Sequence, residues 1–572
     1  MAQPSRIYPP LYPDITDWPI YQLYRDREDF VREIDEHAFA SLVERFGDDL
    51  SRLMARTAYL ELIRLKENPW KSDPPNEKQF WKRVRRELSE NARHREDVRD
   101  ERNEELLRRI VHRYSEEIAG NFHQKTFKFA RKFLTAFFKR LLNTAAGRNY
   151  RRIWGSKHHL YEQLKVYGDV ERVRACFNQG TVVIVPTHFS NLDSVVIGYA
   201  LDTIVGLPSF SYGAGLNLYN SEIAAYFMSR LGAYRVDRRK RNHIYLETLK
   251  TMSNLSLQRG VNSLFFPGGT RSRSGALESE VKMGLLGSLV EAQRSMYVQG
   301  KDSKIIIIPL VLSYHFVLEA RMLIDQFLER AGEEKYLLMP DEFQSVRKIL
   351  RFAWQFFSQS SDISLSFGEP MDVMGNRLDA DGRSIDERGN VMLIREYFTH
   401  DGQITKNKQR EAVYTRHLGK KIVDAYHRYN VVLSSHIVAF AAFQQLKQMN
   451  PELDLFGLIR LPTDEFVFDR VLLLDVIGQV TTHLCEMADQ GQVKLPDELK
   501  TMDTRMLLEQ GMKNLGIYHT DNPLTTNKRG ELVSKSFKLL YFYHNRLSHY
   551  QLESTIAWNQ ELVAQAQVMA DF

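Results

Sequence analysis

The sequence predicts a central α/β domain between a helical N-terminal region and a helical C-terminal region. The chain has 572 residues, too many for a single hydrophobic core, and a chain of this length has about two to four domains. Hydrophobic residues make up 43% and charged residues 26%, ordinary values that exclude wholesale disorder. Short apolar runs, typical of buried strands, occur in the middle of the chain, and helical patterns fill both flanks.

The N-terminal region is predicted to be helical up to residue 121. Residues 28–118 carry many charges, including the run Lys82–Arg113. The alternating signs of this run favour a solvated helix face over a nucleic-acid-binding arm. Residues 1–19 contain five prolines and no basic segment followed by an apolar one. We therefore expect an extended surface segment there and no signal peptide.

A basic amphipathic helix is predicted to open the central domain, for which we expect the bounds 122–375. Apolar residues recur at steps of three and four from Phe127 to Ala145, beside six lysines and arginines. Two surroundings fit such a helix: an anionic membrane surface, or its own domain with a basic outer face. No stretch reaches the roughly 18 apolar residues of a transmembrane helix. Any membrane contact is therefore expected to be interfacial.

The strands of the central domain are predicted from short β-branched or aromatic runs. The four runs are Thr181–Pro186, Val261–Phe266, Ile305–Leu312 and Ile363–Phe367. Residues 371–390 are rich in Gly, Asp and Arg, which predicts a loop. Their aspartates lack the full spacing of a calcium-binding loop, so a plain surface loop is expected. From Val391 onwards the pattern is helical again, and we expect a helical C-terminal domain over 376–572.

The first chemical motif, Thr187–Asp193, directly follows a predicted strand. Ligands of α/β sheets bind outside the carboxyl ends of strands, which is where His188 would lie. Asp193 is five residues further on and can reach the imidazole only through a turn, with Ser190 or Asn191 as the helix N-cap. A carboxylate on one ring nitrogen would leave the other nitrogen as a general base. The alternative is a loop histidine without catalytic role.

The second motif follows another strand and has the sequence FFPGGTRSRSG from Phe265 to Gly275. Gly268 and Gly269 would let a ligand approach the backbone. Arg271 and Arg273, on either side of Ser272, offer bidentate donors for a phosphate. The spacing is not that of an NTPase phosphate loop, and the alternative is a tight surface turn.

A third block, Gly232–Arg241, is a predicted strand that leads into a basic cluster containing Arg238. Such a cluster is expected to be solvated unless another site converges on it. The chain has no G-x-S-x-G sequence, so the nucleophile need not be a serine of the protein, and a substrate hydroxyl could take that place.

In their order along the chain, the H-x₄-D motif, Gly232–Arg238, Phe265–Gly275 and Ile307–Val311 resemble the four blocks of the glycerolipid acyltransferase family. The resemblance covers about residues 125–370. Gly215–Leu218 is similar to a segment that the family often carries between its first two blocks. Leu540–His549 resembles a C-terminal helix of the large glycerol-3-phosphate and dihydroxyacetone-phosphate acyltransferases. The resemblance implies an α/β acyltransferase domain with a central mixed sheet flanked by helices.

The resemblance also implies roles for individual residues. His188 would be the general base and Asp193 its orienting partner, and Arg238, Arg271 and Arg273 would hold the substrate phosphate. Gly268, Gly269 and Ser272 fall in the block that shapes the acceptor and oxyanion site, Lys282 falls where many members have a lysine, and Ile305–Leu312 would support the acyl-donor side. The chain departs from the family at Gly268, where many members have Glu, and at Tyr234 and Arg235, which replace a more usual apolar pair.

The expected reaction is transfer of an acyl group from acyl-CoA or acyl carrier protein to the sn-1 hydroxyl of glycerol 3-phosphate, giving lysophosphatidate. The alternatives are lysophosphatidate or dihydroxyacetone phosphate as the acceptor, and a non-catalytic membrane-binding scaffold. We expect peripheral contact with the cytoplasmic face of an anionic membrane.

No metal, organic cofactor or nucleic acid is expected as a partner. Two cysteines, Cys176 and Cys485, are too few for a Cys-based zinc site or a disulfide framework and fit a reducing compartment. A net charge of +6 is too mild to imply nucleic acid.

Overall fold

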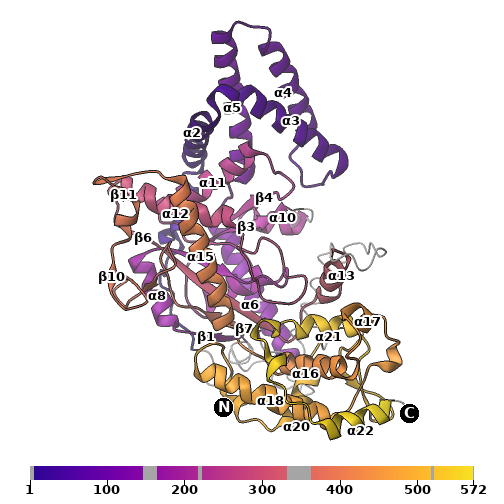
Figure 1. Ribbon diagram of the computed structural model, residues 1–572. Coiled ribbons are helices and arrows are strands. Elements are labelled where there is room, and N and C mark those ends of the chain that lie inside the picture. The colour runs from indigo at the N-terminus through magenta and orange to yellow at the C-terminus, as the bar shows by residue number, and fades with distance from the viewer. Residues whose placement is uncertain are drawn as a thin grey trace.

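The computed structural model describes residues 6–145, 164–216, 219, 222–330, 363–516, 519 and 521–570. A bundle of N-terminal helices projects from one end of a central sheet domain, and the C-terminal helices gather at its other end (Figure 1). A continuous hydrophobic core joins the central sheet to the C-terminal helices. A second core lies between the N-terminal helices and the central domain.

The central sheet has seven strands in the order β1-β7-β6-β2-β5-β3-β4. Strands β6, β2, β5, β3 and β4 run parallel to one another, β7 is antiparallel to β6, and β1 is parallel to β7. The predicted mixed sheet flanked by helices is therefore confirmed. The strands are β1 (Leu164–Tyr167), β2 (Gly180–Pro186), β3 (Ser211–Gly215), β4 (Ala233–Val236), β5 (Ser263–Leu264), β6 (Lys304–Tyr314) and β7 (Ile363–Phe367).

Three of the four strand predictions agree with the structure to within two residues at either end. The prediction for Val261–Phe266 was too long, because only Ser263 and Leu264 form β5. The side-chain oxygen of Asn262 accepts the N–H of Val182 in β2. This side-chain hydrogen bond takes the place of a backbone hydrogen bond between β2 and residue 262. After Leu264 the chain leaves the sheet to form the loop of the second motif.

Helices cover the central sheet. Asp193, the last residue of the first motif, begins α9. Helix α12 packs against both α11 and α15. The helices of this part are α6 (Gln124–Ala145), α8 (Val170–Gln179), α9 (Asp193–Thr203), α10 (Glu222–Met228), α11 (His243–Gln258), α12 (Met283–Val298) and α13 (Ala320–Arg330).

The N-terminal helices confirm the helical prediction and pack against the central domain through α11. Residues 6–14 precede the first helical turn, and the N–H groups of Tyr8 and Leu11 bond to the loop after α9. The helices are α1 (Pro19–Arg25), α2 (Arg27–Phe46), α3 (Leu50–Glu67), α4 (Glu77–Asn91) and α5 (Glu96–Ile118). Trp81 and Tyr114 are completely buried in their core, and the ring of Tyr114 contacts that of Tyr245 from α11.

Helix α6 divides its aromatic residues between the interior and the surface. Ala130 is buried and Phe127 half-buried, as the predicted apolar stripe requires, but Phe129 and Phe133 are 58% and 47% exposed. Phe133 belongs to the predicted stripe, so the stripe is only partly covered. The side chains of residues 137–145, which complete the stripe, lie outside the described residues, as do Asn217 and Leu218.

The prediction of a plain loop over 371–390 and of helix from Val391 onwards was incomplete. Short antiparallel strands interrupt both segments, because tight turns at Gly382 and Gly389 reverse the chain. The strands are β8 (Arg377–Leu378), β9 (Ser384–Ile385), β10 (Val391–Met392), β11 (Thr399–His400), β12 (Gln403–Ile404), β13 (Val467–Phe468), β14 (Thr525–Thr526) and β15 (Leu532–Val533). The helices are α15 (Lys408–Arg428), α16 (Ser434–Met449), α17 (Leu455–Ile459), α18 (Arg470–Asp489), α19 (Asp497–Lys500), α20 (Thr504–Asn514), α21 (Phe537–His544) and α22 (Gln560–Ala570).

One helix in the described part of the chain, α18, is long and apolar enough to cross a membrane by length and composition alone. Its mean hydropathy reaches 1.3, and 39% of that window is buried inside the molecule. The buried face of α18 packs against α16 and α20. The same composition is found in core helices of soluble proteins, so this helix alone does not indicate a membrane span.

Candidate active site

The candidate site lies at one edge of the central sheet. Strands β2, β4, β5 and β6 are parallel, so their carboxyl ends meet at the same edge. Each is followed by a loop that carries polar side chains, and ligands of α/β sheets bind at this edge. His188 follows β2, Arg238 follows β4, the FFPGGTRSRSG loop follows β5, and Glu319 follows β6.

His188 and Asp193 are in direct contact, as predicted. The His188 Nδ1 atom lies 2.8 Å from Asp193 Oδ2, and Asp193 is completely buried. The predicted N-cap was wrong, because α9 begins at Asp193 with Leu192 as the cap position. The turn is held instead by Asp193 itself, whose Oδ2 accepts the N–H groups of Phe189 and Ser190.

The contacts of Asp193 determine which nitrogen of His188 carries the proton. Asp193 Oδ1 accepts the hydroxyl of Tyr314 at 2.7 Å, and Oδ2 accepts two backbone N–H groups. A carboxylate that serves as an acceptor in all these contacts also accepts from the imidazole, so Nδ1 carries the hydrogen. The lone pair of Nε2 is then available as a base. The ring of Phe266 stacks on the imidazole with centroids 4.1 Å apart.

The side chain of His188 remains 13% exposed, so a substrate can reach the ring. Glu319 extends the support of the loop by accepting the Ser190 hydroxyl at 2.9 Å and the Asn191 N–H at 3.0 Å. The loop after β2 is therefore held both by Asp193 at the start of α9 and by Glu319 from the loop after β6.

Arg238, Arg271 and Arg273 lie close enough to one another to interact electrostatically. The pKa of Arg238 is lowered, first by loss of hydration and then by the positive charges of Arg271 and Arg273. Mutual repulsion of this kind is relieved when an anion binds between the cations. Arg271 also pairs with Glu319 at 3.1 Å. The structure therefore brings together the three arginines predicted to hold a phosphate, and they lie on loops at the same sheet edge as His188.

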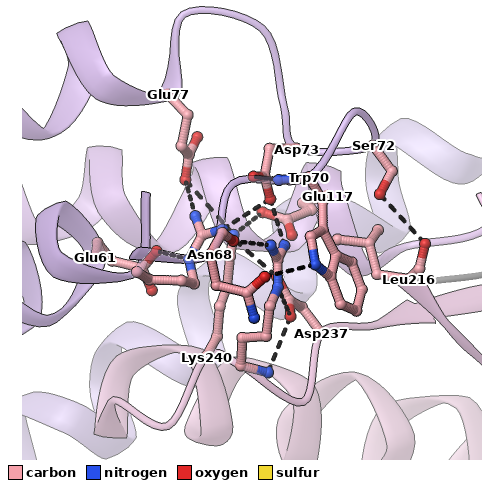
Figure 2. Close-up of polar contacts among 12 residues, drawn as sticks. Glu61, Asn68, Trp70, Ser72, Asp73, Glu77, Glu117, Leu216, Asp237 and Lys240 are labelled. Atoms are coloured by element: carbon pink, nitrogen blue, oxygen red, sulfur yellow. Dashed lines mark hydrogen bonds and ion pairs between the residues drawn. The ribbon is translucent and has the colours of Figure 1, made fainter. Parts of the chain in front are cut away.

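A buried ion network holds the residues on both sides of Arg238. Arg239 bonds to Asp237 through Nε at 2.9 Å and donates to the Asn68 carbonyl oxygen at 2.8 Å. Its guanidinium also contacts Asp73 and lies 3.9 Å from the centroid of the Trp70 ring. Figure 2 shows Asn68, Trp70 and Asp73 gathered around the Asp237 loop.

The same network reaches Lys240, whose Nζ lies 2.5 Å from Glu117 Oε2 and 3.5 Å from Glu77 Oε1. The surrounding carboxylates of Glu117, Glu77 and Glu61 raise the pKa of Lys240 despite its burial. The carboxylates come from the N-terminal helices and their loops (Figure 2). Part of the charged N-terminal region is therefore buried against the central domain and is not only a solvated face.

Arg238 and Arg241 are the exposed members of this loop. Arg238 has no ion-pair partner in the described part of the chain, whereas its neighbours Asp237, Arg239 and Lys240 are all engaged. The network thus fixes the backbone on both sides of Arg238 and leaves its guanidinium exposed.

The loop after β5 uses several of its predicted site residues to maintain its own shape. Gly269 adopts a left-handed backbone with φ +76° and donates its N–H to the Phe266 carbonyl oxygen at 3.0 Å. Ser272 donates its N–H to the His188 carbonyl oxygen at 2.8 Å and its hydroxyl to Ala276. Lys282 is exposed, and its N–H bonds to the Pro267 carbonyl oxygen at 2.7 Å. Ser272 therefore ties the second motif to the first.

The C-terminal segment Leu540–His549 supports both motifs. Asn545 donates to the Ser274 carbonyl oxygen at 2.9 Å, and Phe542 packs against Gly275 so closely that a Cβ there would meet its carbonyl oxygen at 2.1 Å. The guanidinium of Arg546 lies 4.3 Å from the centroid of the Phe189 ring. Helix α21 confirms the helical prediction for Leu540–His544, and residues 545–549 continue as turns that end in a 3₁₀ helix.

Two acidic residues at the site, Glu278 and Glu319, were not predicted. Glu319 could have been considered because it follows a strand that ends at the same sheet edge. Glu278 follows the second motif and carries no motif of its own. In the described residues, no group of three or more His, Cys, Asp or Glu side chains could hold a metal ion.

Residues 163–313 match the family model described as Acyltransferase. The match covers His188, Asp193, the three arginines, Glu278 and Lys282, and ends within β6. The chain therefore contains an acyltransferase domain, and the match supports acyl transfer as the chemistry of the site. Glu319, the N-terminal helices and Leu540–His549 lie outside the matched residues.

Proposed function

We propose that this protein transfers a fatty acyl group from acyl-CoA or acyl carrier protein to the sn-1 hydroxyl of glycerol 3-phosphate, giving lysophosphatidate for phospholipid synthesis. The observation that carries the proposal is that the His188–Asp193 pair and the three arginines lie on loops at one sheet edge, where Glu319 joins the His188 loop to Arg271. A base and an anion-binding cluster side by side suit an acceptor that carries both a hydroxyl and a phosphate.

The acceptor is activated by His188. Its Nε2 takes the proton of the acceptor hydroxyl while the oxygen attacks the thioester carbonyl carbon. The tetrahedral intermediate collapses, the C–S bond breaks, and the thiolate leaves and is protonated by the imidazolium or by water. General-base assistance of this kind contributes about 10²- to 10⁴-fold to a rate. Asp193 keeps the proton on Nδ1 and stabilises the imidazolium.

The arginines position the acceptor. Arginine guanidinium groups bind phosphate oxygens in a bidentate manner, which fixes orientation as well as position. With the phosphate held at Arg238, the hydroxyl at the other end of a short molecule can be directed to His188. Fixing two reactants in this way removes several kcal/mol of the barrier.

We assign glycerol 3-phosphate as the acceptor because of a resemblance in the C-terminal region. Leu540–His549, which resembles a helix of the large glycerol-3-phosphate acyltransferases, contacts the loops of both motifs. Lysophosphatidate and dihydroxyacetone phosphate carry the same phosphate, so the arginines alone do not distinguish the acceptors.

We expect the protein to meet its acyl donor and product at the surface of an anionic membrane, on the cytoplasmic face. Phe129 and Phe133 on α6 are exposed beside Lys125, Lys128 and Lys132. Exposed aromatic rings among basic residues suit the interface of a bilayer that contains anionic lipid. Vesicle sedimentation tests this: a Phe129→Ala, Phe133→Ala variant should bind less to anionic vesicles, whereas Tyr59→Ala, an exposed aromatic on α3, should bind normally.

The acceptor assignment is tested by supplying labelled palmitoyl-CoA with glycerol 3-phosphate, dihydroxyacetone phosphate or lysophosphatidate in parallel. Acylation of glycerol 3-phosphate at sn-1 is the expected result. Acylation of only one of the other acceptors would agree with the assigned active site but contradict glycerol 3-phosphate as the acceptor. No transfer with any acceptor, with either palmitoyl-CoA or palmitoyl carrier protein as donor, would favour a non-catalytic membrane-binding scaffold.

A further inference from the structure

The loop after β5 has Gly268 where many acyltransferases of this kind have a glutamate, and a carboxyl group nevertheless lies beside it. A Cβ built on Gly268 would lie 3.1 Å from Cγ, 3.3 Å from Oε1 and 3.7 Å from Cδ of Glu278. These three atoms of Glu278 are the nearest neighbours of that position. The space that a side chain at 268 would enter is therefore filled by Glu278.

The backbone at Gly268 does not itself require glycine. Gly269, the next residue, has φ +76° and adopts the left-handed conformation that disfavours other residues, whereas Gly268 is not among the positive-φ residues. A side chain at 268 is thus opposed by contact with Glu278 and not by the fold of the loop. The two positions compete for one volume.

Glu278 uses its position to hold the catalytic loop. Its Oε1 accepts the backbone N–H of His188 at 2.9 Å. The next N–H groups along the chain, those of Phe189 and Ser190, are accepted by Asp193. A buried N–H without a partner would cost about 1–3 kcal/mol. Glu278 therefore determines where the backbone of His188 lies relative to Asp193.

We propose that Glu278 is a positioning residue of the active site, which supplies from ten residues further along the chain the carboxyl group that this loop lacks at Gly268. The inference rests on the proposed acyl transfer, in which His188 is the base. Glu278 Oε2 is buried and has no hydrogen-bond partner in the described part of the chain. The carboxyl is thus held by packing and by its bond to His188, and the cation of Arg546 acts on it electrostatically.

The proposal predicts that the two positions can exchange the carboxyl group. Glu278→Ala should lower kcat on the order of tenfold or more through loss of the His188 contact. Glu278→Gln, which keeps an acceptor oxygen, should retain most of the activity. Gly268→Glu alone should lower activity, because it forces a second carboxyl into an occupied buried volume. The double variant Gly268→Glu, Glu278→Ala should be more active than either parent single variant.

Amide hydrogen exchange of a peptide that covers residues 187–192 gives a readout without acyl transfer. Glu278→Ala should exchange faster there than the wild type, while Glu278→Gln and the double variant stay close to it. Glu280→Gln, an exposed neighbour, is the matched control. The inference is overturned if folded Glu278→Ala has the kcat and the hydrogen-exchange rate of the wild type. It is also overturned if the double variant is no more active than either single variant. If the wild type transfers no acyl group, the proposed function is refuted and kcat cannot be compared. The hydrogen-exchange measurement would still test the role of Glu278.

Discussion

The hydroxyl of Tyr314, the last residue of β6, donates to Asp193 Oδ1 at 2.7 Å. Asp193 begins α9 and contacts His188 with its other oxygen. A strand on one side of the site thus fixes the carboxylate that orients the base. Burial and the neighbouring charge of Asp193 raise the pKa of Tyr314 well above its usual value, so the phenol remains protonated and can donate.

Removal of this hydroxyl should lower both the free energy of unfolding and kcat. Tyr314→Phe takes one donor from a buried carboxylate, and hydrogen bonds to charged groups contribute about 1.5–3 kcal/mol. We expect urea unfolding to show a loss of stability in this range and kcat to fall several-fold with little change in KM. A Tyr314→Phe protein with wild-type unfolding midpoint and kcat would contradict the assignment of Tyr314 as a support for Asp193.

Arg238 should determine the affinity for the phosphorylated acceptor. Arg238→Ala removes a charged phosphate contact worth about 1.5–3 kcal/mol, which corresponds to a rise in KM for the acceptor of about 10- to 150-fold. Arg241→Ala is the matched control, because Arg241 is also exposed and lies three residues along the same loop. Steady-state kinetics at varied acceptor concentration measure both. Equal effects of the two variants would mean that the loop contributes only general positive charge.

The network around Lys240 should stabilise the contact between the N-terminal helices and the Arg238 loop. Lys240→Met leaves Glu117 without its partner, and breaking a buried ion pair in this way costs about 3–5 kcal/mol. Unfolding measurements should show this loss and the KM for the acceptor should rise. Lys240→Met combined with Glu117→Gln should recover much of the stability, since no unpaired charge remains. No recovery in the double variant would show that the pair is not the relevant interaction.

Glu278 should make stability depend on pH. Burial raises its pKa to about 7, although the His188 N–H and Arg546 oppose the rise, and Asp193 adds to it. Tyr426 also lies close enough to interact with it. A carboxyl with a raised pKa binds its proton more readily in the folded state. Its contribution to stability is therefore complete below the unfolded pKa of 4.5 and declines as pH rises to about 7.

Glu278→Gln removes this dependence. At about 1.4 kcal/mol per pKa unit, the variant should gain about 2 kcal/mol more over the wild type at pH 8.5 than at pH 5.5. Urea unfolding of both proteins at the two pH values measures the difference, with Glu280→Gln as the exposed control. A constant difference between the variant and the wild type at the two pH values would show that Glu278 does not titrate in this range.

Local sequence predicted the parts of the site whose partners are near in the chain. His188 and Asp193 are joined by a single turn, so their spacing allowed the contact, and the family resemblance implied it. The grouping of Arg238 with Arg271 and Arg273 was implied by the family resemblance, which rests on the order of the four blocks. The predicted N-cap failed, because Asp193 accepts the N–H groups of the turn itself.

The support of the site depends on contacts between distant segments, and these leave no local pattern. Glu61 and Arg64 form an i,i+3 pair on a charged helix, which is typical of a solvated surface, yet both are buried. Only the packing of α3 against the Asp237 loop distinguishes them. Glu278 was missed for a related reason. Its carboxyl group occupies the space beside Gly268, and this contact is visible only in the folded structure.

The most direct test of the account is the rate of acceptor-dependent thiol release from palmitoyl-CoA by the wild type and by His188→Ala, with glycerol 3-phosphate at saturation. His94→Ala, which changes an exposed histidine far along the chain from the site, is the control. We predict acceptor-dependent release by the wild type and the control, and a loss of at least 10²-fold in His188→Ala, since the variant lacks the general base. Equal rates in folded wild type and His188→Ala would contradict the central claim that His188 activates the acceptor.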